Sequence, residues 1–439
     1  MAFSLHGVHA PHRKNTEGSE PKRILPAKTV TIPMSMHIGR PAAPVLNVGD
    51  TVKVGTKIAE AQGPVSSPIY SSVSGKITAI SDFLTAMGTT TQAIVITSDG
   101  EMTPDETIAP PTVDSKDTFV AAVRDAGIVG LGGAGFPTHV KFNVDSDKIE
   151  YLIINCAECE PYITSDTHTM LHRADDMELA LTTIAKFYSI KKVIVGIEAN
   201  KVSAIESMKA LAEKLNGVID TEVNVLPSLY PQGGEKVLIY HTAGRVVPFG
   251  KLPIDVGCAV INCTTLAAIG AYLKTGMPLV EKCLTVDGGA VKEPCNLIAP
   301  IGTPMKDIFD ACGGFIEEPA KVLYGGPMMG ISVPDTDKPV MKNTNAVLAL
   351  TAKEAKMPKT TACIRCGSCT NSCPFGIAPA EIMKALDNRD AESLDKLSVM
   401  SCMECGCCSF VCPANRPLTQ TNKIAKQFLK EEKSKEAAK

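Results

Sequence analysis

The sequence has 439 residues, of which 44% are hydrophobic and 21% charged, and its formal net charge is −3. This length suffices for two to four domains with buried cores, and the near-neutral charge argues against nucleic acid as a partner. The sequence has no run of about 18 apolar residues and no secretory signal, which predicts a cytoplasmic chain without a direct membrane span, whose sixteen cysteines serve metal or redox chemistry.

The first two segments predict an arm followed by a small β domain. Residues 1–28 are rich in Pro, His and charge, which favours an extended arm along a surface. From 29 to 110, short β-branched runs alternate with Gly and Pro turns, and this stretch resembles the barrel-sandwich hybrid domain of biotinyl and lipoyl carriers. A carrier needs a lysine at its hairpin tip within a characteristic tripeptide. The corresponding stretch here reads SSVSGK, which favours a scaffold over a lipoylated arm.

Residues 114–278 show alternating strand and helix patterns. We expect a helix at 118–126, a buried strand at 151–155, and one long helix at 165–188 capped by Ser165 or Asp166. Strand, helix and strand follow at 191–198, 201–215 and 221–227, with further helical stretches at 233–243 and 262–274. This alternation predicts a parallel sheet covered by helices, an architecture that often binds nucleotides.

The remaining chain predicts two smaller modules. Residues 279–340 return to short strands and turns around one helix, which suggests a β-grasp-like module. Residues 341–439 are expected to be helical and end in a tail in which Lys alternates with Glu. Both cysteine clusters lie in this last region.

The two cysteine clusters share one spacing, since CIRCGSCTNSCP (363–374) and CMECGCCSFVCP (402–413) both spell CxxCxxCxxxCP. In two-cluster ferredoxins the first three cysteines bind one cube, and the fourth, which precedes Pro, binds the other. The predicted ligands are Cys363, Cys366, Cys369 and Cys412 for one [4Fe–4S] cluster, and Cys402, Cys405, Cys408 and Cys373 for the second. Structural zinc is the alternative, but zinc sites have no need of the third cysteine or the Pro. Cys407 lies outside the spacing and is predicted to be a packing residue.

A glycine-rich stretch, GLGGAGFPTHVK (130–141), satisfies the GxGxxG dinucleotide fingerprint. Its context differs from a Rossmann fold, because Gly130 follows a helical pattern and FPT stands where a helix should begin. The glycines allow the backbone to approach a phosphate or a flat ring closely, and Lys141 adds a cation. A turn-rich loop without a ligand is the alternative interpretation.

The stretch NCAECEPYITSD (155–166) follows the first predicted strand of the α/β region. Asn155, Glu158 and Glu160 should therefore lie at the carboxyl end of a parallel strand, where such sheets bind ligands. The carboxylates could hold ribose hydroxyls or face a flavin, or they could be solvated loop acids. Cys156 and Cys159 form a single CxxC pair and are predicted to be packing residues.

Taken together, GLGGAGFPTHVKF, NCAECEPYITSD, YPQGGEK and GTPMKDIF…GGPMMG, followed by the doubled cysteine motif, resemble the RnfC family, whose members belong to the Rnf (Rsx) electron transport complex. The resemblance covers nearly the whole chain, and the middle is also similar to the flavin- and NADH-binding subunit of respiratory complex I. It implies a multidomain α/β plus β fold with four parts: a barrel-sandwich N-domain, a complex I flavoprotein-like FMN/NADH domain, an SLBB-like β-grasp module and an α-helical ferredoxin domain.

The resemblance also implies roles for individual residues. The loop beside the flavin and the nicotinamide nucleotide would consist of Gly130, Gly132, Gly133, Gly135 and Phe136, with Lys141 near phosphate. The isoalloxazine and NADH site would be lined by Asn155 and by Glu158 and Glu160 as catalytic residues, and completed by Glu235 and Asn262. Leu131, Ala157 and Lys236 depart from the complex I pattern, where Arg, Asp and Glu are common.

The implied function is that of a peripheral subunit on the cytoplasmic side of the cell membrane, within an ion-translocating ferredoxin:NAD oxidoreductase. Its cofactors would be non-covalent FMN and two [4Fe–4S] clusters, and NAD(H) its substrate. Its partners would be the membrane subunits and an iron-sulfur subunit that accepts electrons from ferredoxin. Two alternatives stay open: a cobalamin reductase-type flavo-iron-sulfur protein, and a flavin-free electron-relay scaffold.

Overall fold

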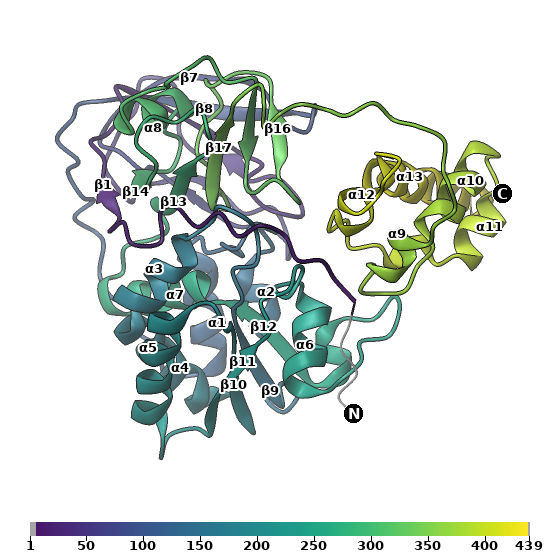
Figure 1. The fold of residues 1–439 in the computed structure, drawn as a ribbon. Coiled ribbons are helices and arrows are strands. Elements are labelled where there is room, and N and C mark those ends of the chain that lie inside the picture. Colours follow the sequence, from purple (N-terminus) through teal and green to yellow (C-terminus); the bar gives the residue numbers. More distant parts are fainter. Residues whose placement is uncertain (1–5, 438–439) are drawn as a thin grey trace.

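The computed structural model describes residues 6–437. Figure 1 shows the β-rich parts above an α/β domain, and a helical C-terminal domain to one side at the end of an extended connection. The N-terminal arm runs between the β-rich and α/β parts. Its short strand β1 (Lys22–Arg23) pairs in parallel with β14 (Cys295–Pro300), so the arm becomes the edge of a sheet formed far along the chain.

The barrel-sandwich domain consists of two antiparallel sheets. One has the order β2 (Thr29–Pro33), β8 (Thr90–Ser98), β7 (Gly75–Leu84) and β4 (Thr51–Val52). The other has the order β3 (Ala43–Pro44), β5 (Lys57–Glu60) and β6 (Ile69–Tyr70). Val30 and Ile32 on β2 and Ile94 and Ile96 on β8 alternate with more exposed residues and fill the core, as the two-residue period of a strand requires.

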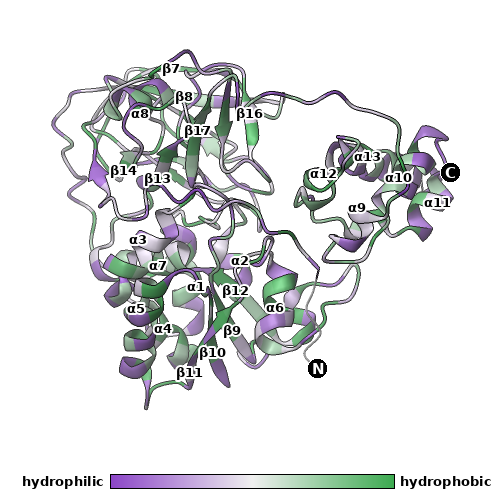
Figure 2. Ribbon diagram, in the orientation of Figure 1, coloured by the Kyte–Doolittle hydropathy of each residue, from purple (hydrophilic) through white to green (hydrophobic). Residues whose placement is uncertain are grey.

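The α/β domain contains a four-stranded parallel sheet with the order β11 (Thr221–Leu226), β10 (Lys192–Glu198), β9 (Tyr151–Cys156) and β12 (Cys258–Asn262). Its helices are α1 (Lys116–Asp125), α2 (Thr138–Phe142), α3 (Ser165–His172), α4 (Ala174–Phe187), α5 (Val202–Leu215), α6 (Glu235–Ala243), α7 (Cys263–Thr275) and the 3-10 turn η1 (Pro253–Val256). Figure 2 shows that helices such as α4 and α5 contain both hydrophobic and hydrophilic residues, as amphipathic helices that cover a sheet do. The central strands are continuous apolar runs because both faces of the sheet are covered.

The single helix predicted at 165–188 is wrong, because the structure breaks it into α3 and α4 at Arg173. Arg173 leaves the helical region (φ −129°, ψ 27°), and its guanidinium binds Asp176 and the carbonyl of Ala267. The predicted caps are also wrong. The N-cap is Thr164, while the side chains of Ser165 and Asp166 are used in tertiary hydrogen bonds.

The β-grasp module is a six-stranded mixed sheet with the order β1-β14-β13-β17-β15-β16, packed on helix α8 (Met305–Ala311). Its other strands are β13 (Glu281–Asp287), β15 (Lys321–Tyr324), β16 (Ile331–Val333) and β17 (Ala346–Leu350). Strand β17 pairs with β13 and β15 although it lies within the region predicted as helical from residue 341. A short apolar run such as AVLAL has no periodicity that distinguishes strand from helix, so that boundary is misplaced.

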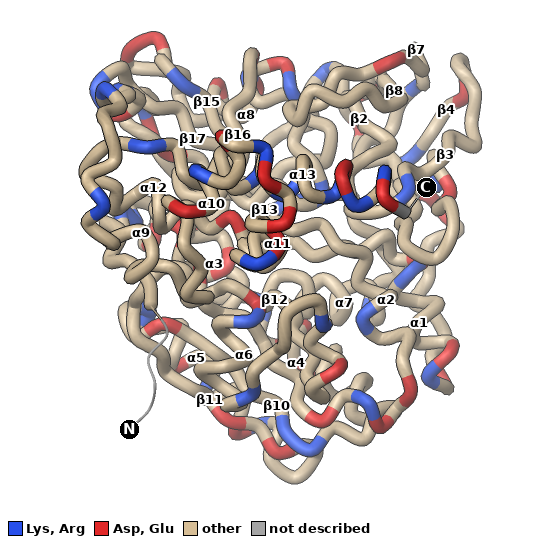
Figure 3. Tube along the Cα trace, turned by 90° about the vertical axis from the view of Figure 1, so that its right-hand side faces the viewer, with Lys and Arg blue, Asp and Glu red and all other residues tan. Residues whose placement is uncertain are grey.

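The C-terminal domain contains α9 (Ser368–Asn371), α10 (Pro379–Asp387), α11 (Ala391–Lys396), η2 (Val399–Ser401), α12 (Cys407–Phe410) and α13 (Leu418–Ala437). Its small core forms around Ile382, Leu394 and Leu429. Figure 3 shows basic and acidic residues alternating along α13. Within residues 6–437, none of the helices combines the length and the hydropathy needed to cross a membrane.

Candidate flavin, nucleotide and cluster sites

The first candidate site lies at the carboxyl edge of the parallel sheet, where several loops meet. Asn155 and Asn262 are register partners on the neighbouring strands β9 and β12. The amide of Asn155 donates to the carbonyl of Gly233 at 2.9 Å, in the turn before α6. Lys141 on α2 donates to the Glu235 carboxylate at 3.1 Å and to the carbonyl of Val260 at 2.7 Å. The structure therefore brings these four predicted residues, Lys141, Asn155, Glu235 and Asn262, to one partly exposed edge.

The glycine-rich loop borders the same edge. Gly133 (φ +119°) and Gly135 (φ +67°) have backbone angles that favour glycine, and a side chain at Gly132 would meet the Asn262 amide at 3.0 Å. The loop is held from outside its own domain, because Asn343 donates to the carbonyl of Gly133 at 2.7 Å. Residues 132–134 are exposed, so their amides can approach a ligand.

The flanks of the loop differ partly from the prediction. Val129 and Pro137 form an isolated antiparallel bridge that closes the loop, and α2 begins at Thr138, directly after FP. A helix therefore does follow the glycines, although it has only five residues and the segment before them is helix α1 rather than a strand. The partly exposed Phe136 follows Gly135, and Leu131 is buried with its amide bound to Thr265.

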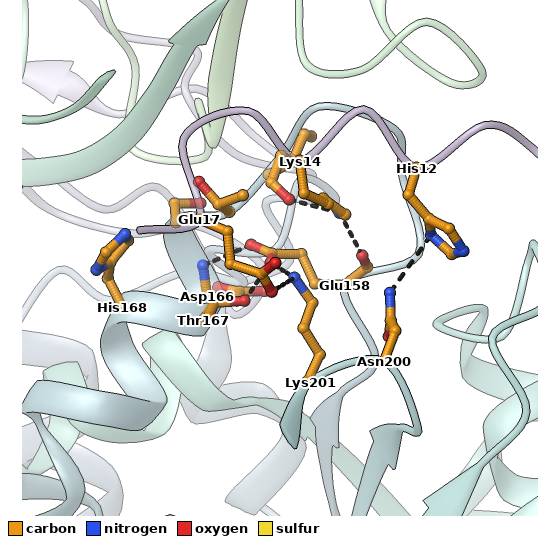
Figure 4. Close-up of polar contacts among 12 residues, drawn as sticks. His12, Lys14, Glu17, Glu158, Asp166, Thr167, His168, Asn200 and Lys201 are labelled. Carbon is orange, nitrogen blue, oxygen red and sulfur yellow. Dashed lines mark hydrogen bonds and ion pairs between the residues drawn. The ribbon is translucent and has the colours of Figure 1, made fainter. Parts of the chain in front are cut away.

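Glu158, predicted to be catalytic, lies in a buried network with Lys201 and the start of α3 (Figure 4). One carboxylate oxygen accepts from the amide of Asp166 at 2.7 Å, and the other accepts from the Thr167 hydroxyl at 2.7 Å. The buried ammonium of Lys201 pairs with it at 3.2 Å. Its side chain is only 3% exposed, and both of its oxygens are engaged in this network. The start of α3 stabilises the Glu158 carboxylate in this buried position, because the first turn of a helix has free amides and a partial positive charge.

Glu160 lies differently, against the β-grasp module. One of its oxygens accepts from the amides of Met328 and Met329, at 3.2 and 2.7 Å. The other, Oε2, is buried and has no hydrogen-bond partner within the described chain. Burial raises the pKa of Glu160 to about 7, although the two amides oppose this shift. A buried, half-satisfied carboxyl is the kind of group whose hydrogen bonding a bound ligand can complete.

Asn262 contributes to the edge through its place at the start of α7. Its side-chain oxygen caps the helix by accepting from the amide of Thr265, and its nitrogen donates to Asp166 at 2.7 Å. Asp166 is buried and also accepts from Thr264 at 2.6 Å. Burial, with the nearby Glu158, raises the pKa of Asp166. This network joins α3 to α7 beneath the glycine loop.

The eight predicted cluster ligands surround two separate cavities. One, with an empty volume of about 320 Å³, is lined by Cys373, Cys402, Cys405 and Cys408. The other, about 710 Å³, is lined by Cys363, Cys366, Cys369 and Cys412. Each cavity thus takes three cysteines from one motif and the fourth from the other, which is the crossed grouping that the spacing predicts.

The cavities fit cubic clusters in the chemistry of their ligands. Within residues 6–437, no three His, Cys, Asp or Glu side chains converge in the way a single ion requires. A four-iron cube is larger than one ion, so its ligands stand around an open volume. Burial raises the pKa of the Cys408 thiol to about 11, and metal coordination would offset that cost by binding the thiolate.

The cavity of Cys373, Cys402, Cys405 and Cys408, here called the inner cavity, is bordered by a cysteine loop that packs against the turn before α6 and the loop of Met328. The hydroxyl of Tyr230 donates to the carbonyl of Cys405 at 2.6 Å. A side chain at Gly234 would meet the end of Met403 at 2.5 Å, and one at Gly406 would meet the carbonyl of Met328 at 2.8 Å. The cysteine loop therefore touches both the turn before α6 and the loop that binds Glu160.

The extra cysteines are packing residues in the structure. Cys156 is buried in the core of the α/β domain. Cys159 accepts a hydrogen bond from the amide of Gly233, and burial raises its pKa. Cys407 is fully buried beside Tyr230 and Val8.

Several residues that shape these sites were missed from the sequence. Lys14 and Lys201 belong to the buried network around Glu158, Asn343 holds the glycine loop, and Tyr230 binds the cysteine loop beside the inner cavity. Tyr230 begins the YPQGGEK motif, so a signal for it was present. Lys14 and Asn343 lie far from any motif in sequence, and only their tertiary contacts reveal them.

Four family models match successive parts of this chain. They are the RnfC barrel sandwich hybrid domain at residues 3–101, the Nuo51 FMN-binding domain at 123–271, the SLBB domain at 284–332 and the 4Fe-4S dicluster domain at 356–413. FMN and two [4Fe–4S] clusters are accordingly its cofactors.

Relatives match nearly the whole chain. It is 41% identical over 426 residues to the C subunit of the Na(+)-translocating ferredoxin:NAD(+) oxidoreductase complex of Acetobacterium woodii, with 96% of each chain covered. The chain belongs to the RnfC family. It is also 42% identical over 394 residues to the C subunit of the proton-translocating complex of Clostridium ljungdahlii, covering 88% of this chain and 84% of the relative. The C subunit of the Rhodobacter capsulatus ion-translocating oxidoreductase complex is 38% identical over 442 residues, with 99% and 85% covered.

Membership of the RnfC family makes the protein a subunit of an electron-transferring oxidoreductase complex. It supports the main prediction over the cobalamin reductase and flavin-free alternatives. Among solved structures, the NAD+-reducing [NiFe]-hydrogenase has a similar fold, with TM-scores of 0.52 (H2-reduced) and 0.53 (air-oxidized) at 18% identity. These alignments cover 72% and 73% of this RnfC protein, but only 61% and 64% of the hydrogenase chains, which is less than two thirds of their length.

Proposed function

We propose that this RnfC protein binds NAD(H) at the sheet edge and passes electrons between NAD(H) and its two clusters through FMN. The contact between the inner cavity and the loops of that edge supports this function most directly. Tyr230 joins them, because it lies in the turn before α6 and donates to Cys405. FMN supplies the step from two electrons to one, since a hydride carries two electrons and each cluster accepts one.

At the sheet edge, each residue has a part that follows from its present contacts. Lys141 provides the cation for a phosphate and would exchange its ion pair with Glu235 for that anion. Asn155 and Asn262, on adjacent strands, each use one amide hydrogen, on Gly233 and on Asp166, so each would have its second amide hydrogen for a ligand. The exposed backbone of Gly132 and Gly133 lets a flat ring approach, because no side chain intervenes.

The two glutamates have different roles in this proposal. Glu160 borders the ligand, with its unpartnered oxygen available as a hydrogen-bond acceptor or, when protonated, as a donor. Glu158 is a positioning residue, because its carboxylate ties the loop to the start of α3.

For the clusters, we propose the crossed ligand sets that line the two cavities. The cavity of Cys363, Cys366, Cys369 and Cys412, here called the outer cavity, has two exposed cysteines, Cys363 and Cys366. The outer cluster would therefore exchange electrons with a neighbouring iron-sulfur subunit. We place the protein at the cytoplasmic side of the cell membrane, as a peripheral subunit attached through the membrane subunits of its complex.

Anaerobic reduction of the purified holoprotein tests this function. NADH should bleach the flavin absorbance, FMN should be released on denaturation, and reduced clusters should then appear by electron paramagnetic resonance. Lys141→Ala should lower FMN content. Lys191→Ala, which removes an exposed lysine at the opposite end of the same sheet, is the matched control and should not. Flavin that stays oxidised with excess NADH would refute the proposal.

A further inference from the structure

The N-terminal arm crosses the loop that follows β9, and Lys14 is its main contact with that loop (Figure 4). The Lys14 ammonium donates to three backbone carbonyls, those of Glu158 at 2.7 Å, Glu160 at 2.8 Å and Ile163 at 2.5 Å. An ammonium group has three donors, so all of them are used on one loop. Hydrogen bonds from a charged donor are also stronger than neutral ones.

The loop requires such an anchor, because residues 157–164 form neither helix nor strand. Tyr162 has a φ of +71°, a left-handed conformation that is unfavourable for a residue other than glycine. The arm binds this strained residue at both ends. The Tyr162 amide donates to the carbonyl of His12 at 2.9 Å, and Arg13 donates to the Tyr162 hydroxyl at 2.6 Å.

The same arm is linked to the cysteine loop that borders the inner cavity. Val8 and Tyr230 form an antiparallel bridge with hydrogen bonds of 2.8 and 3.0 Å, and Tyr230 donates to the carbonyl of Cys405. One short segment therefore contacts the acidic loop and, through Tyr230, the cysteine loop.

The contacts of Lys14 differ from those of an ordinary ion pair. Its hydrogen-bond acceptors are carbonyl oxygens, so the lysine determines a backbone shape rather than balancing one carboxylate. A second link lies beside it, where Glu17 of the arm pairs with the buried Lys201 at 3.1 Å, and Lys201 pairs with Glu158. Methionine at position 14 would have similar length but no donors, and would leave three carbonyls without their partner.

We propose that Lys14 is a positioning residue for the loop that faces the nicotinamide and the inner cluster. Its ammonium gathers the carbonyls of residues 158–163, so that Glu160 stays against the amides of Met328 and Met329 and Cys159 stays against Gly233. Lys14 acts through the loop backbone, since its ammonium donates to backbone carbonyls and to none of the side chains proposed to meet the ligand. This inference rests on the function proposed above for that edge.

The test compares Lys14→Met and Lys14→Arg with Lys28→Met, which removes an exposed lysine of the same terminal region. Hydrogen exchange of the holoprotein reports the loop directly, through the amides of residues 157–164. Anaerobic flavin reduction at varied NADH reports its function. In Lys14→Met, loop exchange should accelerate about tenfold or more, and the rate at saturating NADH should fall about tenfold to a hundredfold, with FMN and iron content retained. Lys14→Arg should recover part of both, and Lys28→Met should match the wild type.

Unchanged loop exchange in Lys14→Met, or slow flavin reduction without faster exchange, would overturn the inference. If Lys14→Met does not fold, the test uses Lys14→Ala purified in the presence of methylammonium, a small cation that can take the place of the missing lysine ammonium. Exchange protection that depends on methylammonium then supports the inference, and its absence overturns it. If NADH does not reduce the flavin of the wild-type protein, the proposed function is overturned instead. The exchange data do not depend on that function, so the two failures can be distinguished.

Discussion

The two cysteine motifs have the same spacing and nearly the same loop backbone, but they lie in different surroundings. Arg365 (φ +54°) and Glu404 (φ +62°) hold equivalent left-handed positions, and each amide donates to the sulfur of the first cysteine of its motif at 3.4 Å. Around the outer cavity, Cys363 and Cys366 are exposed and Ile364 is 68% exposed. Around the inner cavity, Cys405 and Cys408 are buried, and the loop packs against Tyr230 and Met328.

This difference shows that a local sequence can specify a cluster-binding loop without specifying its place in an electron path. Spacing and left-handed residues are properties of about a dozen residues, whereas burial depends on other domains. The inner loop is buried because the turn before α6 and the β-grasp module cover it. The predictions below test whether the two sites differ in the way that their surroundings imply.

The largest effects should come from removing the fourth cysteine of each motif, because the crossed grouping assigns it to the other cavity. Cys412→Ser should abolish the outer cluster and leave the inner one, and Cys373→Ser should do the reverse. Iron content should fall from about eight to about four per chain in each. After reduction with NADH, Cys412→Ser should still show a reduced cluster by electron paramagnetic resonance, and Cys373→Ser should not.

If the grouping were not crossed, Cys412→Ser would lose the inner cluster instead. Cys407→Ser is the matched control, because this cysteine neighbours Cys408 but lines the inner cavity without belonging to a proposed ligand set. It should retain both clusters.

Exposure should also make the outer cluster the more labile of the two. With an iron chelator under mild oxidation, iron should be released in two phases of about equal size, and the faster phase should belong to the outer site. Repeating the measurement with Cys412→Ser should remove the fast phase. A single phase in the wild type would show that burial does not distinguish the sites.

A smaller effect is expected at the contact between the turn before α6 and the inner loop. Tyr230→Phe removes the hydrogen bond to the carbonyl of Cys405 and leaves that oxygen buried. We expect a loss of about 1–3 kcal/mol in the free energy of unfolding and slower electron transfer from flavin to cluster. Thermal unfolding and anaerobic stopped-flow absorbance would measure the two effects. Tyr324→Phe, which removes a buried hydroxyl bonded to Pro339 in the β-grasp module, should affect stability alone.

The smallest effect concerns the pH dependence of stability that arises from the buried carboxyl of Glu198. Burial raises the pKa of Glu198 to about 7, against the opposing effects of Lys14 and Lys201. Between its ordinary pKa near 4.5 and pH 7 the folded protein therefore binds more protons than the unfolded chain, so this group lowers stability as pH rises. Glu198→Gln should remove a decline on the order of 1–3 kcal/mol across that range. Unfolding midpoints at pH 5, 6 and 7 would measure it, and parallel profiles for variant and wild type would contradict it.

Much of the fold followed from local patterns. The alternation of strands and helices in residues 114–278 predicted the parallel sheet, and turn spacing predicted the β character of residues 29–110. The errors have definite physical causes. The break at Arg173 comes from hydrogen bonds to Asp176 and Ala267, since neither glycine nor proline marks it. Strand β17 is decided by its pairing with β13 and β15, which lie distant in sequence.

The sequence alone determined which chemistry the chain can support. Two CxxCxxCxxxCP motifs select cubic clusters, and the glycine loop permits close approach of a ligand. Each of these features depends only on residues that are neighbours in sequence, so the sequence reveals it. The tertiary structure decided how these parts are used. It buried Glu158 in a network with Lys201, left Glu160 half satisfied, covered the inner cavity and placed Lys14 across the acidic loop. These outcomes depend on desolvation and on contacts between segments up to hundreds of residues apart, which no local pattern encodes.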